Sequence, residues 1–299
     1  MSIRKACMLS LALLLASVSP AQNQNPPFVQ PGNVEIQRDL VYSSVGSREL
    51  HLDLFLPKEG AGPFPAVVYI HGGGWTGGNK SAFQRQAAYM ATKGYVGACM
   101  EYRLSGEARY PAAVHDSKAA VRWLRANAAR YRIDPKRMGA AGGSAGGHLV
   151  AFLGTTGEKK QFEGQGGNPG VSTRVRAVAA FNPVLDMTMV RLRDPAASAS
   201  GALEKFLGAS YAERPDLYAE ASPTTHVSRD SAAFLFLHGT ADTTVPYQQS
   251  VEMMKKLKEA GVYADLFSAE DARHGFFNSP PWYEPTLKKM EEFFNQFLK

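Results

Sequence analysis

The chain has 299 residues, of which 44% are hydrophobic, and its formal net charge is +6 at pH 7. This length allows one large domain or two small ones, and the composition is that of a globular protein with a sizeable core. The lysines and arginines are spread along the chain without a cluster, which argues against nucleic-acid binding.

The N-terminus has the pattern of a secretory signal peptide over residues 1–21. Two basic residues precede an apolar run over residues 8–16, and Ser19 and Ala21 supply small residues at the cleavage site. The run is too short to cross a bilayer. We therefore expect cleavage after Ala21, a linker over residues 22–33, and export to the periplasm or beyond the cell with no remaining membrane attachment.

The first strands expected after the linker form a hairpin. Leucines alternate with other residues over residues 49–56, which is the period of a strand, and a preceding Gly-Ser pair favours a turn from a strand over residues 36–43. Residues 65–70 and 95–100 are instead continuous apolar runs, typical of strands covered on both faces. The second run contains Cys99, the one cysteine left after cleavage, so an intramolecular disulfide is excluded.

Strands and helices alternate along the rest of the chain. Further strands are predicted over residues 137–142, 176–181, 232–239 and 263–269. Helices are predicted over residues 81–94, 111–130, 148–154, 247–261 and 281–299. This alternation predicts an α/β fold with a mostly parallel sheet, antiparallel N-terminal strands and helices on both faces. Residues 34–299 are expected to form one domain, with a loop over residues 186–201 as a candidate flap over a cleft.

Ser144 is the candidate nucleophile. It is the central residue of the G-x-S-x-G sequence at positions 142–146, between a predicted strand and a predicted helix. Serine and glycine also form ordinary turns, but a position between strand and helix favours a nucleophile elbow. A serine hydroxyl reacts poorly alone, so it needs a base, an acid that orients the base, and donors for the developing oxyanion.

The sequence HGGGW at residues 71–75 is the candidate oxyanion loop. Its glycines let backbone N–H groups approach a ligand closely, and it follows a predicted strand, where open α/β sheets bind ligands. We expect the N–H groups of Gly73, Gly74 and Ala145 to face the oxyanion. Trp75 is a candidate for stacking against the substrate, with packing beneath the loop as the alternative.

The acid and the base are expected later in the chain. Asp242, after the penultimate predicted strand, is the preferred acid, and Asp186, after an earlier strand, is the alternative. Of seven histidines, His274 completes the chain order Ser, Asp, His that α/β-hydrolases use. Asp271 is too near His274 in the chain to be a good geometric partner. His148 is one helical turn after the serine and is expected to point away from it.

Motifs for metals and cofactors are absent from the sequence. It lacks H-E-x-x-H, paired cysteines and a phosphate-binding loop, and the glycine spacing of HGGGWTGG is not that of a dinucleotide fingerprint. We expect neither a metal ion nor a cofactor.

Six segments together carry a family resemblance: HGGGW, EYRLSGEARYPAAVHDSKAAVRWLRANA, RIDPKRMGAAGGSAGGHLVAFLG, FEGQGGNPGVSTRVRAVAAFNPVLD, LHGTADTTVP and RHGF. They resemble secreted bacterial α/β-hydrolase esterases of the acetylxylan/feruloyl esterase type, which are related to hormone-sensitive-lipase-like esterases. The resemblance covers nearly all of residues 34–299 and implies the α/β-hydrolase fold for this range.

The resemblance also implies roles for single residues. It assigns Ser144 as nucleophile, His274 as base and Asp242 as acid, with the same three backbone N–H groups at the oxyanion. It further implies an internal ion pair between Arg103 and Asp116. One departure is the sequence FNPVLD, where many members of the family carry a turn of the Gly-Pro-Thr-Asp type, so the acyl pocket nearby is expected to differ in shape.

The function that the resemblance implies is a secreted serine esterase. Its expected substrates are small esters or acylated oligo- and polysaccharides of the plant cell wall, with acetyl as the first choice and feruloyl as the second. Trp282 and Tyr283 are further candidates for stacking against a sugar or a feruloyl ring. An arylformamidase-type amidase is an alternative that export disfavours, and a non-catalytic binding module is an alternative that the full set of catalytic candidates disfavours. The sequence does not indicate an oligomeric state.

Overall fold

The structure, a computed structural model, describes residues 28–189 and 198–299. The predicted signal peptide and most of the predicted linker lie outside the described residues, as does part of the predicted loop over residues 186–201. No helix within the described ranges is both long enough and apolar enough to cross a membrane.

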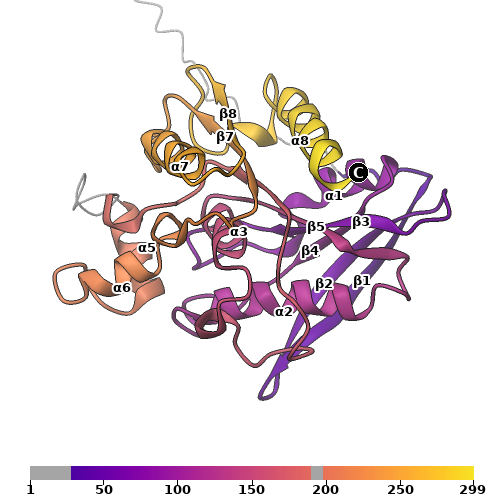
Figure 1. Cartoon of the computed structure of the whole chain (residues 1–299), viewed down its shortest axis with the longest axis horizontal. Coiled ribbons are helices and arrows are strands. Elements are labelled where there is room, and N and C mark those ends of the chain that lie inside the picture. Colours follow the sequence, from indigo (N-terminus) through magenta and orange to yellow (C-terminus); the bar gives the residue numbers. More distant parts are fainter. Residues whose placement is uncertain (1–27, 190–197) are drawn as a thin grey trace, which may run out of the picture.

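Eight strands in the described part of the chain form one sheet in the order β1-β2-β4-β3-β5-β6-β7-β8 (Figure 1). Their bounds are β1 Val34–Val45, β2 Arg48–Pro57, β3 Phe64–Ile70, β4 Val96–Met100, β5 Ile133–Gly143, β6 Ala177–Phe181, β7 Ala233–Gly239 and β8 Ala264–Ala269. β2 pairs antiparallel with β1 and with β4, and all other pairs are parallel. This sheet confirms the predicted α/β class and the predicted N-terminal hairpin.

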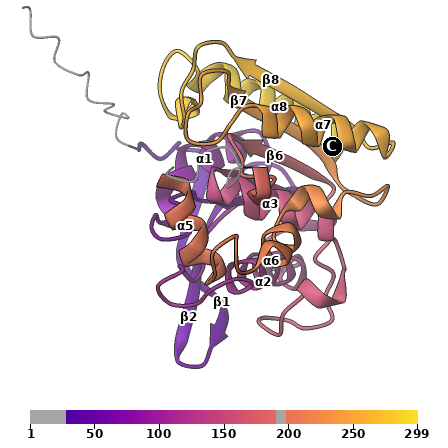
Figure 2. The same cartoon turned by 90° about the vertical axis from the view of Figure 1, so that its left-hand side faces the viewer.

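Helices cover both faces of the sheet, with α1 and α8 on one side and α2 on the other (Figures 1 and 2). The α-helices with fully described bounds are α1 Gln84–Thr92, α2 Ala112–Ala126, α3 Ala145–Thr156, α5 Ser198–Leu207, α6 Pro215–Glu220, α7 Gln248–Glu259 and α8 Tyr283–Leu298. Tyr69 and Leu237 face α1 and α8, whereas their neighbours Val68 and Phe236 face the side of α2 and α3. Because both faces are covered, these strands are apolar at successive positions, as the sequence predicts.

The helix predicted over residues 111–130 is shorter in the structure. α2 ends at Ala126, and the side chain of the next residue, Asn127, donates from Nδ2 to the carbonyl oxygen of Trp123 at 2.9 Å. Asparagine side chains compete in this way with the regular helical hydrogen bonds. The chain then turns towards β5.

The predicted loop over residues 186–201 is wrong at its C-terminal end, because α5 begins at Ser198. Residues 198–201 are rich in Ser and Gly, which form helices weakly, whereas residues 202–207 contain good helix formers with apolar residues at helical spacing. Leu203 and Phe206 of α5 are buried, and the Phe206 ring stacks on Trp75 with 4.6 Å between ring centroids. α5 therefore forms a wall beside the loop that follows β3.

The topology brings the loops of the predicted site together. β3, β5, β6, β7 and β8 are parallel neighbours, so the loops at their carboxyl ends lie at one edge of the sheet. Ligands of open α/β sheets bind at this edge.

Candidate active site

Ser144 occupies the turn between β5 and α3 in a strained backbone conformation, with φ 55° and ψ −120°. Such angles cost energy and persist only where the surroundings enforce them. The flanking glycines are required by contacts with neighbouring backbone. A Cβ added at Gly146 would collide with the carbonyl oxygen of Ile70, and one added at Gly142 would lie 2.6 Å from the carbonyl oxygen of Gly146. The turn can therefore form only without side chains at these two positions.

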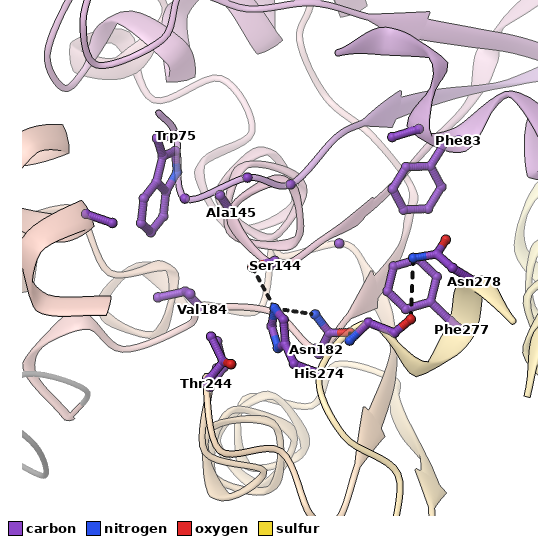
Figure 3. Close-up of a pocket in the computed structure, with 18 of the residues that line it drawn as sticks. Trp75, Phe83, Ser144, Ala145, Asn182, Val184, Thr244, His274, Phe277 and Asn278 are labelled. Carbon is purple, nitrogen blue, oxygen red and sulfur yellow. Dashed lines mark hydrogen bonds between the residues drawn. The ribbon is translucent and has the colours of Figure 1, made fainter. Parts of the chain in front are cut away.

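Ser144, His274 and Asp242 form a continuous chain of hydrogen bonds. His274 Nε2 lies 3.0 Å from Ser144 Oγ (Figure 3), and His274 Nδ1 lies 2.7 Å from Asp242 Oδ2. With the proton on Nδ1, the imidazole donates to the carboxylate and presents the Nε2 lone pair to the serine hydroxyl. The structure thus brings the three sequence-predicted residues together in the geometry of a nucleophile, a base and an orienting acid.

The carboxylate of Asp242 is held by four donors. Its Oδ1 accepts the backbone N–H groups of Thr244 and Val245 at 2.8 and 2.9 Å. Its Oδ2 faces both His274 and His238, whose Nε2 lies 3.3 Å away. Burial alone would raise the pKa of Asp242, but the hydrogen bonds with the two histidines outweigh burial and hold this pKa well below its usual value. The acid is therefore ionised at neutral pH.

The contact of His238 with Asp242 was not predicted from the sequence. His238 also contacts the loop after β7, since Nε2 lies 3.1 Å from the carbonyl oxygen of Val245, and Nδ1 lies 2.7 Å from Ser250 Oγ. The signal available in the sequence was the spacing of four residues between His238 and Asp242 across a turn at the end of β7. The acid thus has a second imidazole partner besides His274.

The glycine loop after β3 lies against the elbow. Gly73 and Gly74 have φ angles of 110° and 58°, which glycine adopts far more readily than other residues. Close packing holds the loop there, because a Cβ on Gly72 would lie 2.7 Å from the carbonyl oxygen of Gly143. Ala145 is the first residue of α3, where a backbone N–H has no partner within the helix. The three predicted oxyanion donors therefore belong to residues that line one pocket with Ser144.

The pocket at this site has a volume of about 430 Å³. Trp75, Val184 and Thr244 lie on one side of the Ser144–His274 pair, and Phe83, Phe277 and Asn278 lie on the other (Figure 3). The size and largely apolar wall suit a small organic ligand whose reactive group reaches the serine.

Comparison with known proteins identifies the family. A model of the family described as BD-FAE matches residues 52–257. The chain belongs to the BD-FAE family. Among curated proteins, the chain is similar to the "Probable carboxylic ester hydrolase LipM" of Mycobacterium tuberculosis, with 32% identity over 76% of this chain and 54% of that protein. It is also similar to "Esterase LipC" of the same organism, with 30% identity over 72% of this chain and 53% of that protein. The chain spans about half the length of these curated relatives.

Solved structures show the same fold. A "truncated form of carbohydrate esterase from gut microbiota" superposes with a TM-score of 0.80 at 30% identity, covering 89% of this chain and 98% of that one. A thermophilic esterase from Thermogutta terrifontis with bound propionate superposes with a TM-score of 0.74 at 30% identity, covering 89% and 94% of the two chains. This BD-FAE chain therefore has the α/β-hydrolase esterase fold that the sequence predicts.

Trp75 of this BD-FAE chain lines the pocket but is only 2% exposed. Its ring stacks on Phe206, and its Nε1 donates to His148 Nδ1 at 3.3 Å. These contacts favour the packing alternative over a stacking surface for substrate. Trp282 and Tyr283 do not line this pocket, and their role in stacking against substrate stays a prediction. The Trp282 ring packs on Phe267 and Phe276, and the Tyr283 ring lies under the guanidinium of Arg85 at 3.9 Å.

The alternative acid, Asp186, lies elsewhere. Its Oδ1 accepts hydrogen bonds from the backbone N–H groups of Thr188 and Met189 at 2.9 and 3.2 Å, and the residue lines a separate cleft. The ion pair implied between Arg103 and Asp116 is present, with 2.7 Å between Nη2 and Oδ1. In the described part of the chain, no group of three or more His, Cys, Asp and Glu residues is arranged to hold a metal ion.

His148 points away from Ser144, as predicted, and is fully buried. Its Nδ1 accepts from Trp75 Nε1, so its Nε2 carries the proton and donates to the carbonyl oxygen of Ala221 at 2.8 Å. Burial lowers the pKa of His148 from 6.5 to about 4. Between about pH 4 and pH 6.5, His148 is therefore neutral in the folded protein and protonated in the unfolded chain.

This difference predicts a loss of stability in acid. Because the pKa of His148 is lower in the folded state, its contribution is fully present above about pH 6.5 and is lost as the pH falls towards 4. The loss attributable to this residue is on the order of 3 kcal/mol. We expect urea unfolding to give a smaller drop in free energy from pH 7 to about pH 4.5 for His148→Gln than for the wild type. Equal drops in the two proteins would contradict this account.

Asn182, the first residue after β6, was missed by the sequence analysis. Its side chain lines the pocket, and its Nδ2 lies 3.3 Å from His274 Nε2 (Figure 3). The only signal in the sequence was its place in the FNPVLD segment, which departs from the pattern of the resembled family.

Proposed function

We propose that this chain is a serine carboxylic-ester hydrolase. The observation that carries the proposal is the chain of hydrogen bonds from Ser144 Oγ through His274 to Asp242 at the wall of a pocket. Membership of the BD-FAE family and relatives named as a carboxylic ester hydrolase and an esterase support the same reaction.

In the proposed reaction, Ser144 Oγ attacks the ester carbonyl carbon while His274 Nε2 takes the hydroxyl proton. The carbonyl oxygen becomes an oxyanion, which the N–H groups of Gly73, Gly74 and Ala145 stabilise. When the tetrahedral intermediate collapses, the bond to the alcohol oxygen breaks and His274 returns the proton to that oxygen. A water molecule then gives a proton to Nε2 and attacks the acyl carbon. The bond from that carbon to Ser144 Oγ breaks, His274 returns the proton to Oγ, and the acid leaves.

Covalent labelling tests this proposal directly. Paraoxon phosphorylates an activated serine by the same attack, and the esterase 2 of Thermogutta terrifontis has been obtained phosphorylated by it. We expect incubation with paraoxon to modify Ser144 and no other serine, as found by mass spectrometry of peptides. An unlabelled, folded protein would favour the non-catalytic binding module.

The proposed substrates carry short acyl groups. The pocket of about 430 Å³ must hold parts of both the acyl and the alcohol groups, which leaves little room for a long chain. Structures of the Thermogutta terrifontis esterase with propionate and with butyrate support this size class. Val184 and Leu203 are wall residues that a longer chain would displace.

A panel of p-nitrophenyl esters checks the expected acyl preference. Acetate and butyrate esters should be cleaved at least about tenfold faster, by kcat/KM, than the decanoate ester, because the surplus methylenes must stay in water or strain the wall. Decanoate as the best substrate would overturn the proposed size limit while leaving the hydrolase mechanism intact.

The alcohol is proposed to be a plant cell-wall carbohydrate, with acetyl as the first acyl choice and feruloyl as the second. Support comes from the resemblance described above and from similarity to a carbohydrate esterase of the gut microbiota. Mass spectrometry of the acids released from acetylated and from feruloylated xylan tests the assignment. Release of neither acetate nor ferulate would remove the carbohydrate part of the proposal.

Export is proposed from the pattern of basic, apolar and small residues over residues 1–21. The intact mass of the protein recovered from the periplasm or the medium tests it, since cleavage after Ala21 leaves a chain that starts at Gln22.

A further inference from the structure

Asn182 is held rigidly where β6 ends. Its φ of 35° lies in the left-handed region, which asparagine tolerates better than most side chains. Its backbone N–H donates to the carbonyl oxygen of Leu237 on the neighbouring strand at 2.8 Å, and the residue is only 1% exposed. The side chain therefore leaves the sheet from a fixed point beside the pocket.

The contacts of the amide determine which of its ends faces the imidazole. Asn182 Oδ1 accepts the backbone N–H of Gly275 at 3.4 Å, and Nδ2 lies 3.3 Å from His274 Nε2 (Figure 3). The two ends of a carboxamide have nearly the same shape, so their assignment rests on the partners. The N–H of Gly275 can only donate, so the oxygen faces Gly275 and the NH₂ group faces the imidazole.

Two hydrogen-bond donors, the Ser144 hydroxyl and the Asn182 NH₂ group, therefore point at one acceptor, His274 Nε2. The lone pair of His274 Nε2 faces the hydroxyl of Ser144 at 3.0 Å and the NH₂ group of Asn182 at 3.3 Å. The Asn182 contact is favourable only while Nε2 carries no proton, whereas the Ser144 hydroxyl can also accept from a protonated Nε2. Once Nε2 is protonated, the N–H of Asn182 faces another N–H, and the contact becomes repulsive.

We propose that Asn182 is a positioning residue that holds His274 as the unprotonated base and so extends activity towards acid pH. The inference rests on the proposed hydrolase function. Hydrogen bonding to one protonation state of a group favours that state, and here the favoured state is neutral imidazole. The opposing influence is Asp242, whose carboxylate faces Nδ1 and favours imidazolium, with His238 on the far side of the same oxygen.

The balance of these contacts has a kinetic consequence. During acylation the proton moves from Ser144 Oγ to His274 Nε2, and the contact with Asn182 must loosen as it does so. The contact is thus stronger before proton transfer than during it, so it does not accelerate the chemical step. Its effect is on the fraction of enzyme with an unprotonated base, which decides the rate only at acid pH.

Two substitutions suit the left-handed backbone and separate the possible roles. Asn182→Gly removes the amide, and Asn182→Asp replaces the NH₂ group with a carboxylate oxygen of nearly the same shape. The acid limb of kcat/KM should move to higher pH by about 0.5 unit in Asn182→Gly. It should move by about 1 unit or more in Asn182→Asp, where a negative charge faces Nε2.

The measurement is hydrolysis of p-nitrophenyl acetate by the full chain from about pH 5 to pH 9, with thermal unfolding of each variant to verify folding. Asn278→Asp is the matched control. Asn278 lines the same pocket, but its Nδ2 donates to the carbonyl oxygen of Gly275 at 3.4 Å instead of facing the imidazole. We expect the acid limb of kcat/KM to move less in Asn278→Asp than in Asn182→Asp.

A uniform fall in rate at every pH in both Asn182 variants, with the limb unmoved, would mean that Asn182 only packs, and the proposal would be overturned. A limb that moves to lower pH would also overturn it. NMR titration of the His274 imidazole in the same proteins gives a readout that does not need turnover. The expected order of half-protonation, wild type lowest and Asn182→Asp highest, can therefore be tested even if the hydrolase proposal fails.

Discussion

Replacement of Ser144 by alanine is expected to reduce ester hydrolysis by about 10⁶-fold, the scale seen when a serine nucleophile is removed from such a triad. His274 and Asp242 remain in place in this variant, but the attacking oxygen, which lies 3.0 Å from Nε2 in the wild type, is absent. Activity is measured with p-nitrophenyl acetate at high enzyme concentration, and paraoxon should no longer label the protein.

The backbone strain at this position supplies a matched control. Alanine keeps the unfavourable φ of 55° and ψ of −120°, whereas Ser144→Gly relieves the strain while it also removes the hydroxyl. We expect both variants to be inactive and the glycine variant to unfold at the higher temperature. Near-normal turnover by a folded Ser144→Ala protein would falsify the mechanism.

Asp242→Asn is expected to reduce kcat by about 10⁴-fold, as in the serine-protease case of the same substitution. The backbone N–H groups of Thr244 and Val245 would retain the oxygen of the new amide, because Oδ1 accepts both of them now. The NH₂ group would then face His274 Nδ1 and force that nitrogen to accept. The proton of the imidazole would move to Nε2, which could no longer take a proton from the serine.

Asp186→Asn is the control for this result. Asp186 caps its own turn and lines a separate cleft, so its loss should change kcat only slightly. A larger loss of kcat in Asp186→Asn than in Asp242→Asn would show that the acid is assigned wrongly. Circular dichroism of both variants establishes that they are folded.

The strands and the members of the hydrogen-bonded triad were predictable because each leaves a local signal. A strand covered on both faces is a continuous apolar run, as residues 65–70 are. The elbow needs glycines on both sides of Ser144, and a loop at the carboxyl end of a parallel strand is a natural place for polar residues such as Asp242 and His274. In these cases the residues that the fold or the site requires lie next to one another in the sequence.

The features that were missed depend on contacts between distant parts of the chain. The start of α5 was missed because residues 198–201 are rich in Ser and Gly, although Leu203 and Phe206 follow at helical spacing and are buried. Asn182 reaches His274 across 92 positions of sequence. The place of Trp75 directly after the glycines predicts that it lies near the pocket. Whether its ring is exposed or covered depends on Phe206, which is distant in the sequence. Such information exists only in the folded arrangement.

The crowding around the elbow also determines where this protein can be redesigned. Gly142 and Gly146 are enclosed by backbone atoms, which cannot yield as a side chain can, so a mutant library that randomises them would consist mainly of unfolded proteins. Val184, Leu203 and Thr244 reach the same pocket with side chains, and their replacement alters the volume without moving the turn. Directed evolution of acyl selectivity should therefore vary these three wall positions and keep the glycines constant.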